Sequence, residues 1–96
     1  MRFRAVLPDQ LVIAVGRRIA EARESRALTQ EDFATALDVS TKYVQSIEAG
    51  RENLSLRSLA RIATALRVEA SSLLIPPTTG KRKPGRPKIS ARVQSR

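Results

Sequence analysis

The sequence predicts an all-α protein: a compact domain of five helices over residues 9–75, preceded by a short N-terminal extension (1–8) and followed by a disordered basic tail (76–96). Two observations support this prediction. Apolar residues between positions 9 and 75 recur three or four apart, which is the spacing of one helix face, and capping residues precede these stripes. After Pro76 the composition turns to Pro, Gly, Ser, Lys and Arg, which buries too little apolar surface to fold alone.

The first helix is expected over residues 9–26. Asp9 is a plausible N-cap because its carboxylate can accept a backbone N–H, and Pro8 marks the end of an extended segment. The core stripe of this helix is formed by Leu11, Val15, Ile19 and Ala22.

Residues 29–50 are predicted to form two short helices joined by a tight turn. Thr29 can cap the first helix, and Phe33, Ala34 and Leu37 form its apolar face. Asp38 should end it, since Asp tolerates the left-handed backbone conformation better than most residues other than Gly.

The second of these helices should present polar groups to the outside. Ser40 can cap it, and Val44 and Ile47 lie one turn apart on its inner face. The outward positions are Thr41, Lys42, Gln45 and Ser46. A helix with this pattern fits the major groove of DNA, where short polar side chains reach base edges.

Two more helices should complete the core. Ser55 can cap the fourth, whose inward stripe is Leu56, Leu59, Ile62, Ala63 and Leu66. A short fifth helix over residues 70–75 supplies Leu73 and Leu74, and Pro76-Pro77 then ends the ordered chain.

The stretch LTQEDFATALDVSTKYVQSIEAG resembles the helix-turn-helix of the Cro and lambda-repressor-like family of prokaryotic DNA-binding regulators. Shared features are Gln30 at the helix start, the small Ala34 at the helix crossing, and the ending Ile47-Glu48-Ala49-Gly50; the likeness runs from about Val15 to Leu74. The resemblance implies a five-helix lambda-repressor-like fold and a dimeric, sequence-specific transcriptional regulator, commonly a repressor, that binds double-stranded DNA.

The resemblance also implies roles for single residues. Thr41, Lys42 and Ser46 occupy the principal base-reading positions, with Gln45 beside them, and Gln30, Tyr43 and Arg51 stand where relatives hold phosphates. Arg23 and Glu48 occupy the positions of a partly buried ion pair that braces the first helix against the recognition helix. Without the resemblance, these residues would read as an ordinary solvated helix face and two exposed charges.

Three positions depart from the family pattern, which prefers Gly where this chain has Ala27, Asp38 and Arg67. A left-handed backbone at Ala27 and Arg67 would cost about 1–2 kcal/mol each, and less at Asp38. Either these turns are remodelled, or the fold is less stable than that of its relatives.

The charge is concentrated in the tail. Of the net charge of +9, residues 76–96 contribute +7 and residues 1–75 only +2. Such a polycation suits phosphate backbones. The chain has no Cys and no His, which excludes disulfides and Cys/His zinc sites, and no catalytic constellation or phosphate loop is apparent. We therefore expect a cytoplasmic, nucleoid-associated protein that is not an enzyme, needs no metal or cofactor and does not insert into membranes.

The tail allows two interpretations. Its expected DNA contacts are Lys81, Arg82, Lys83, Arg86 and Lys88. The segment Lys83–Lys88 resembles an AT-hook, in which Gly85 would let the backbone lie deep and Arg86 would enter a narrow minor groove. Pro84 replaces the first of that motif's two arginines, so a plain phosphate-binding polycation is the alternative.

Partner and subfamily also remain open. Apolar residues beyond the needs of a five-helix core, namely Phe3, Leu11, Val12, Ile13 and Ile75, indicate either ordinary packing or a homodimer contact. The stretch GRENLSL looks like the segment that follows the recognition helix in restriction–modification controller proteins. The alternative function is an antitoxin or other interaction module whose tail wraps a protein partner and whose fold binds DNA secondarily; a copurifying partner would favour it.

Overall fold

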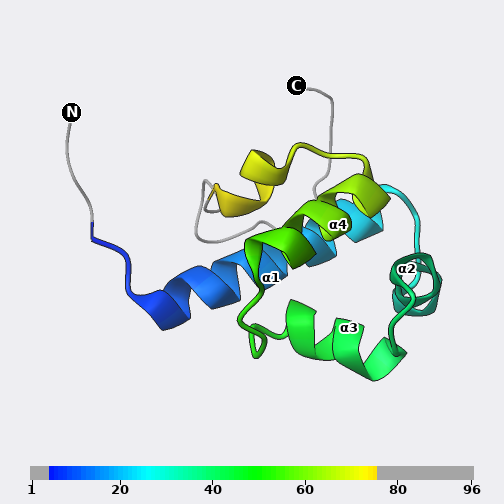
Figure 1. The fold of residues 1–96 in the computed structure, drawn as a ribbon, viewed down its shortest axis with the longest axis horizontal. Coiled ribbons are helices and arrows are strands. Elements are labelled where there is room, and N and C mark those ends of the chain that lie inside the picture. The colour runs from blue at the N-terminus through cyan, green and yellow to red at the C-terminus, as the bar shows by residue number, and fades with distance from the viewer. Residues whose placement is uncertain (1–4, 76–96) are drawn as a thin grey trace.

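The computed structural model describes residues 5–75, and this part of the chain is entirely helical apart from its connections. Its elements in chain order are α1 (Pro8–Ser25), α2 (Gln30–Leu37), α3 (Thr41–Glu48), α4 (Leu56–Leu66) and the 3₁₀-helix η1 (Ala70–Leu74). Figure 1 shows α2 and α3 together at one side, with α1 and α4 crossing beside them and η1 closing over α1 and α4. The predicted tail contacts, the AT-hook segment and Phe3 lie outside the described residues.

Three predicted caps are present at the starts of α2, α3 and α4. The Thr29 hydroxyl accepts from the Asp32 backbone N–H (2.9 Å), and the Asp32 carboxylate accepts in return from the Thr29 N–H (3.1 Å). Ser40 and Ser55 each accept from the backbone N–H three residues on, both at 3.0 Å. These bonds satisfy donors that the first turn of a helix leaves unpaired.

The start of α1 was wrongly predicted. Leu7 is the N-cap residue and Pro8 is the first helical residue, so Asp9 lies within the first turn and does not cap it. Proline suits this position because its fixed φ is helical and its missing N–H would have been unpaired there in any case. The helix ends at Ser25, with Arg26 as its C-cap.

The fifth helix, predicted over residues 70–75, is present as a 3₁₀-helix over Ala70–Leu74. Its N-cap residue, Glu69, makes no side-chain capping bond, and five residues are few for an α-helix without such support. Its position is fixed instead by α1: the Arg18 guanidinium donates two hydrogen bonds to the Ser72 carbonyl oxygen, at 3.2 and 3.3 Å.

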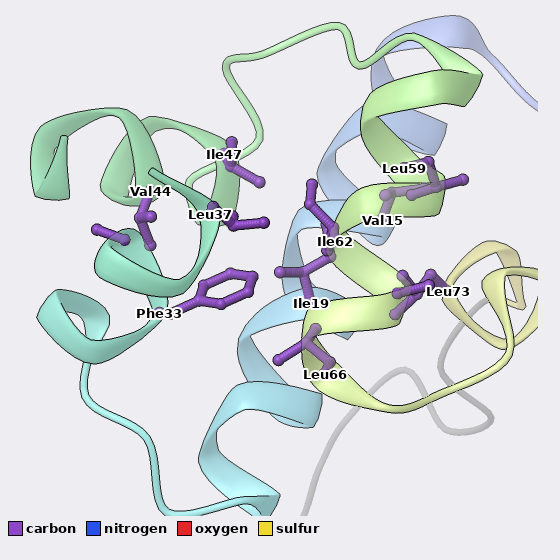
Figure 2. Close-up of a cluster of buried hydrophobic side chains, with 12 residues drawn as sticks. Val15, Ile19, Phe33, Leu37, Val44, Ile47, Leu59, Ile62, Leu66 and Leu73 are labelled. Atoms are coloured by element: carbon purple, nitrogen blue, oxygen red, sulfur yellow. The ribbon is translucent and has the colours of Figure 1, made fainter. Parts of the chain in front are cut away.

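The core is a single cluster to which all five elements contribute (Figure 2). Its largest fully buried side chains are Ile19, Phe33, Val44, Ile47, Leu66 and Leu73. Leu11, Leu56 and Leu74 were predicted to be inward, yet they are 40%, 81% and 43% exposed. Leu56 is the first residue of α4 and lies about 60° around the helix from Leu59, at the edge of the buried stripe.

All three positions that lack the preferred glycine have a left-handed backbone: φ is 58° at Ala27, 60° at Asp38 and 59° at Arg67. The turns are therefore not remodelled. At each one, the N–H of the following residue (Leu28, Val39 and Val68) bonds to the carbonyl five residues earlier, and its apolar side chain packs against the core. This hydrogen bond and apolar contact are those of the Schellman helix ending.

The first helix passes very close to the end of α3. A Cβ atom added at Gly16 would collide with the Ile47 carbonyl oxygen, and one added at Gly50, where φ is 79°, would touch Ile13. The absence of side chains at these two positions lets the C-terminal end of α3 pack directly against the backbone of α1.

Candidate nucleic-acid interface

The outer face of α3 is polar and accessible, while its inner face is fully packed. Val44 and Ile47 are 0% and 2% exposed and hold the helix against the core. On the other side Lys42 and Gln45 are exposed, and Thr41 and Ser46 are partly exposed. Within residues 5–75 the Lys42 ammonium has no hydrogen-bond or ion-pair partner, so it is available to an external acceptor.

The end of α3 is tied to α1 by a bidentate ion pair. Arg23 Nε lies 2.7 Å from Glu48 Oε2, and a terminal nitrogen of the same guanidinium lies 3.0 Å from Glu48 Oε1. The remaining terminal nitrogen donates to the Leu28 carbonyl at 2.8 Å, so Arg23 also holds the corner before α2. The hydrogen bond to Glu48 raises the pKa of Arg23 against the opposing effect of burial.

A third helix joins this ion pair through Gln30, the first residue of α2. Gln30 Nε2 donates to Glu48 Oε1 at 3.0 Å, and Gln45 Nε2 donates to Gln30 Oε1 at 3.5 Å. Arg23, Glu48, Gln30 and Gln45 thus form one hydrogen-bonded chain that runs from α1 to the outer face of α3. Nothing in the local sequence spacing indicates it, because Gln30 lies 18 and 15 residues from its two partners.

The two other residues assigned to phosphates differ in their surroundings. Arg51 is exposed, directly after Gly50, and within the described residues its guanidinium has no hydrogen-bond or ion-pair partner. Tyr43 is partly buried and packs against the core, so only part of its side chain is accessible. Among the three residues expected to contact phosphates, Arg51 alone is positively charged, and its charge is available to a phosphate.

The described domain carries no excess charge. Residues 5–75 contain nine basic and nine acidic side chains, so the net charge of +9 comes from two arginines in residues 1–4 and seven basic residues in 76–96. The positive charge available for a polyanion thus lies mostly outside the folded part, whereas α3 offers directed polar groups.

No helix in the part of the chain that the structure describes is long and apolar enough to span a membrane.

Comparison with known proteins places these features in a family context. The sequence pattern of the helix-turn-helix family HTH_3 matches residues 19–73. Control protein C.MunI of a Mycoplasma species is 33% identical over 66 residues, which cover 68% of this chain and 89% of that protein. The immunity repressor of Bacillus phage phi105 is 37% identical over 62 residues, or 65% of this chain, and the match spans only 43% of the repressor.

Solved structures agree with the sequence comparisons. The restriction–modification controller C.AhdI from Aeromonas hydrophila superposes with a TM-score of 0.61 at 34% identity, covering 65% of this chain and 94% of that one. The controller C.Esp1396I, a tetramer in complex with its natural 35 base-pair operator, superposes with a TM-score of 0.60 at 30% identity, covering 66% of this chain and 83% of that one.

Proposed function

Because the chain belongs to the HTH_3 helix-turn-helix family and is a DNA-binding transcriptional regulator, we propose that α3 is its recognition helix and enters the major groove of a specific operator. The observation that carries this proposal is the division of α3 into two faces. Val44 and Ile47 are buried, and Lys42 and Gln45 on the other side are exposed to solvent, where base edges could reach them.

Four side chains of α3 are proposed to read bases: Thr41, Lys42, Gln45 and Ser46. The Lys42 ammonium suits the two acceptors of guanine in the major groove. The Thr41 and Ser46 hydroxyls can donate or accept, so they suit several bases. Sequence preference should therefore depend most on Lys42 and Gln45, whose side chains are the longer and more exposed.

A second group is proposed to hold the DNA backbone. Arg51 supplies a free cation and Tyr43 supplies a hydroxyl. The Gln30 amide has two N–H donors, and the one that does not bond to Glu48 can donate to a phosphate. Since the described domain is electrically neutral, the tail residues are proposed to supply most of the phosphate neutralisation, either as a polycation or through Arg86 in a minor groove. The basic members of the tail in this role are Lys81, Arg82, Lys83, Arg86 and Lys88.

We further propose that the protein is of the restriction–modification controller type, which the similarity to C.MunI and C.AhdI supports, and that it forms a homodimer through an exposed apolar groove. Leu11, Leu56 and Leu74 are all exposed and line one groove of about 170 Å³ between α1, the start of α4 and η1. A second copy of the chain would cover this apolar surface. A two-fold pair would also place two recognition helices on successive turns of DNA.

The dimer can be tested by sedimentation velocity on wild type, Leu56→Glu and the control Ala60→Glu, which is exposed on α4 outside the groove. We expect wild type and the control to sediment as dimers and Leu56→Glu as a folded monomer, whose melting temperature is lowered only by the loss of association. A wild-type monomer both free and on its operator would overturn the proposal.

The decisive test of function is selection of bound sequences from a pool of random duplex DNA by the full chain. We expect one enriched motif, with two half-sites about 10 base pairs apart from centre to centre. Enrichment of no motif, with equal binding to all duplexes, would contradict sequence-specific regulation.

A further inference from the structure

The orientation of one amide group on the outer face of α3 is set by the buried ion pair. Glu48 is 7% exposed at its side chain and is held by two bonds from Arg23. As a carboxylate it can only accept hydrogen bonds, so the Gln30 amide turns its NH₂ group toward it, with Nε2 3.0 Å from Glu48 Oε1. The opposite orientation would place two acceptors face to face.

This orientation passes to the next residue. With its NH₂ group on Glu48, Gln30 directs its carbonyl oxygen toward α3, where it meets the NH₂ group of Gln45 at 3.5 Å. Gln45 then has its own carbonyl oxygen turned away from Gln30. Within the described residues this oxygen accepts no hydrogen bond, and the Gln45 side chain is exposed.

We infer that Gln30 is a positioning residue, which fixes the Gln45 amide so that its carbonyl oxygen faces the DNA and accepts from the exocyclic amino group of adenine or cytosine. A glutamine without this restraint can turn either group toward a base, and it loses rotamer freedom on binding. The inference rests on the proposed insertion of α3 into the major groove and adds the chemical group that Gln45 reads.

Every base pair carries one such amino group in the major groove, on adenine or on cytosine. The contact is therefore identified by removing the amino group. Sequence selection with wild type and with Gln45→Ala first locates the base pair at which the variant loses preference. Duplexes are then made with purine in place of adenine, or 2-pyrimidinone in place of cytosine, at that pair.

We expect removal of the amino group to weaken wild-type binding about 3- to 10-fold, the range for one hydrogen bond, and to leave Gln45→Ala unaffected. Gln30→Ala should lose most of this sensitivity although Gln45 is intact. Arg51→Ala is the matched control: it should weaken binding to all duplexes and keep the full sensitivity. Glu48→Gln keeps the side-chain volume, but its amide can donate as well as accept, so it no longer forces the Gln30 orientation and should reduce the sensitivity to removal of the amino group. Thermal melting confirms that each variant is folded.

Three outcomes would overturn the inference: no base pair responds to Gln45→Ala, removal of the amino group leaves wild-type binding unchanged, or Gln30→Ala behaves like Arg51→Ala. Each of these still allows sequence-specific binding through Lys42. Failure of wild type to select any motif is a different result, which would remove the proposed function and this inference with it.

Discussion

Single residues at the outer surface of α3 fall into two groups, those held by other side chains and those left free. Gln45 is held through Gln30 and Glu48, whereas Lys42 and Arg51 have no partner within the described residues. A held side chain loses less conformational entropy when it binds, and a free one can adapt to its target. The two free cations differ in place, since Lys42 lies on the helix and Arg51 in the loop after it.

Lys42→Ala should therefore reduce the preference for the selected operator over a scrambled duplex, by about 1–3 kcal/mol if Lys42 contacts guanine. Arg51→Ala should weaken both duplexes alike, because a phosphate contact carries no sequence information. Titrations with the two duplexes at one salt concentration measure both effects. Equal losses for Lys42→Ala on both duplexes would assign Lys42 to the backbone.

The ion pair between Arg23 and Glu48 is expected to contribute to the free energy of unfolding. Arg23→Ala leaves the largely buried Glu48 carboxylate without its cation, and Glu48→Ala leaves Arg23 only the longer ion pair with the exposed Glu24, at 3.6 Å. Each should therefore destabilise the fold by more than the ~0–1 kcal/mol of an exposed pair. The double variant should recover part of the loss. Urea unfolding of the four proteins gives the coupling energy, and simple additivity would mean that the pair contributes no specific interaction.

At the scale of elements, the three left-handed helix ends are held by the turns that follow them. Leu28, Val39 and Val68 each close the last turn with a backbone bond and pack against the core, so the conformation persists without glycine. A left-handed backbone raises the conformational energy of Ala27 and Arg67, whereas Asp38 tolerates this conformation better.

Ala27→Gly and Arg67→Gly should consequently each stabilise the domain, by about 1 kcal/mol after the entropy cost of glycine is deducted. Asp38→Gly should gain less. The control is Ala49→Gly, at a C-cap whose φ of −81° is right-handed, where glycine should give no gain. Thermal melting of the four variants decides this, and a gain at position 49 equal to those at 27 and 67 would show that strain is not the cause.

At the scale of the whole molecule, the polar face of α3 and most of the positive charge lie in different parts of the chain. Residues 5–75 have no net charge, and seven basic side chains follow in residues 76–96 without an acid. This division is consistent with the proposal that α3 reads bases and that the tail supplies the salt-dependent part of the affinity.

A chain ending at Ile75 should remain folded, because the buried core residues that the structure describes all lie between Val15 and Leu73. It should bind the operator more weakly and with a shallower dependence on salt, since each lost phosphate contact removes roughly 0.9 from the slope of log affinity against log salt concentration. Arg86→Ala and Arg92→Ala can be compared on operators with and without flanking A·T tracts. Equal losses of affinity indicate a general polycation, and a larger loss for Arg86→Ala beside A·T tracts indicates a minor-groove arginine. If truncation leaves the affinity and the salt slope unchanged, the tail does not contact DNA, and the interpretation that it binds a protein partner is favoured.

The sequence by itself determined the features that depend on near neighbours. The caps Thr29, Ser40 and Ser55 act within three residues, and the stripes of α2 and α3 follow from helical periodicity, so both were predictable. The resemblance to lambda-repressor-like proteins marked Ala27, Asp38 and Arg67 as departures from glycine, and the structure decided that their backbone is left-handed. Local reasoning failed at Asp9, where proline competed for the helix start, and it did not distinguish a 3₁₀-helix from an α-helix at the fifth element.

Apart from the pair of Arg23 with Glu48, which the family resemblance implied, only the tertiary structure decided which contacts join distant segments. It exposed Leu56 and Leu74 on one groove, tied Ser72 to Arg18 across 54 residues, and linked Gln30 to both Glu48 and Gln45. The physical reason is that helical periodicity fixes the direction of a side chain relative to its own helix axis only. Which partner it meets depends on how closely the helices pack, and here that depends on the approach of α1 to α3 at Gly16 and Gly50.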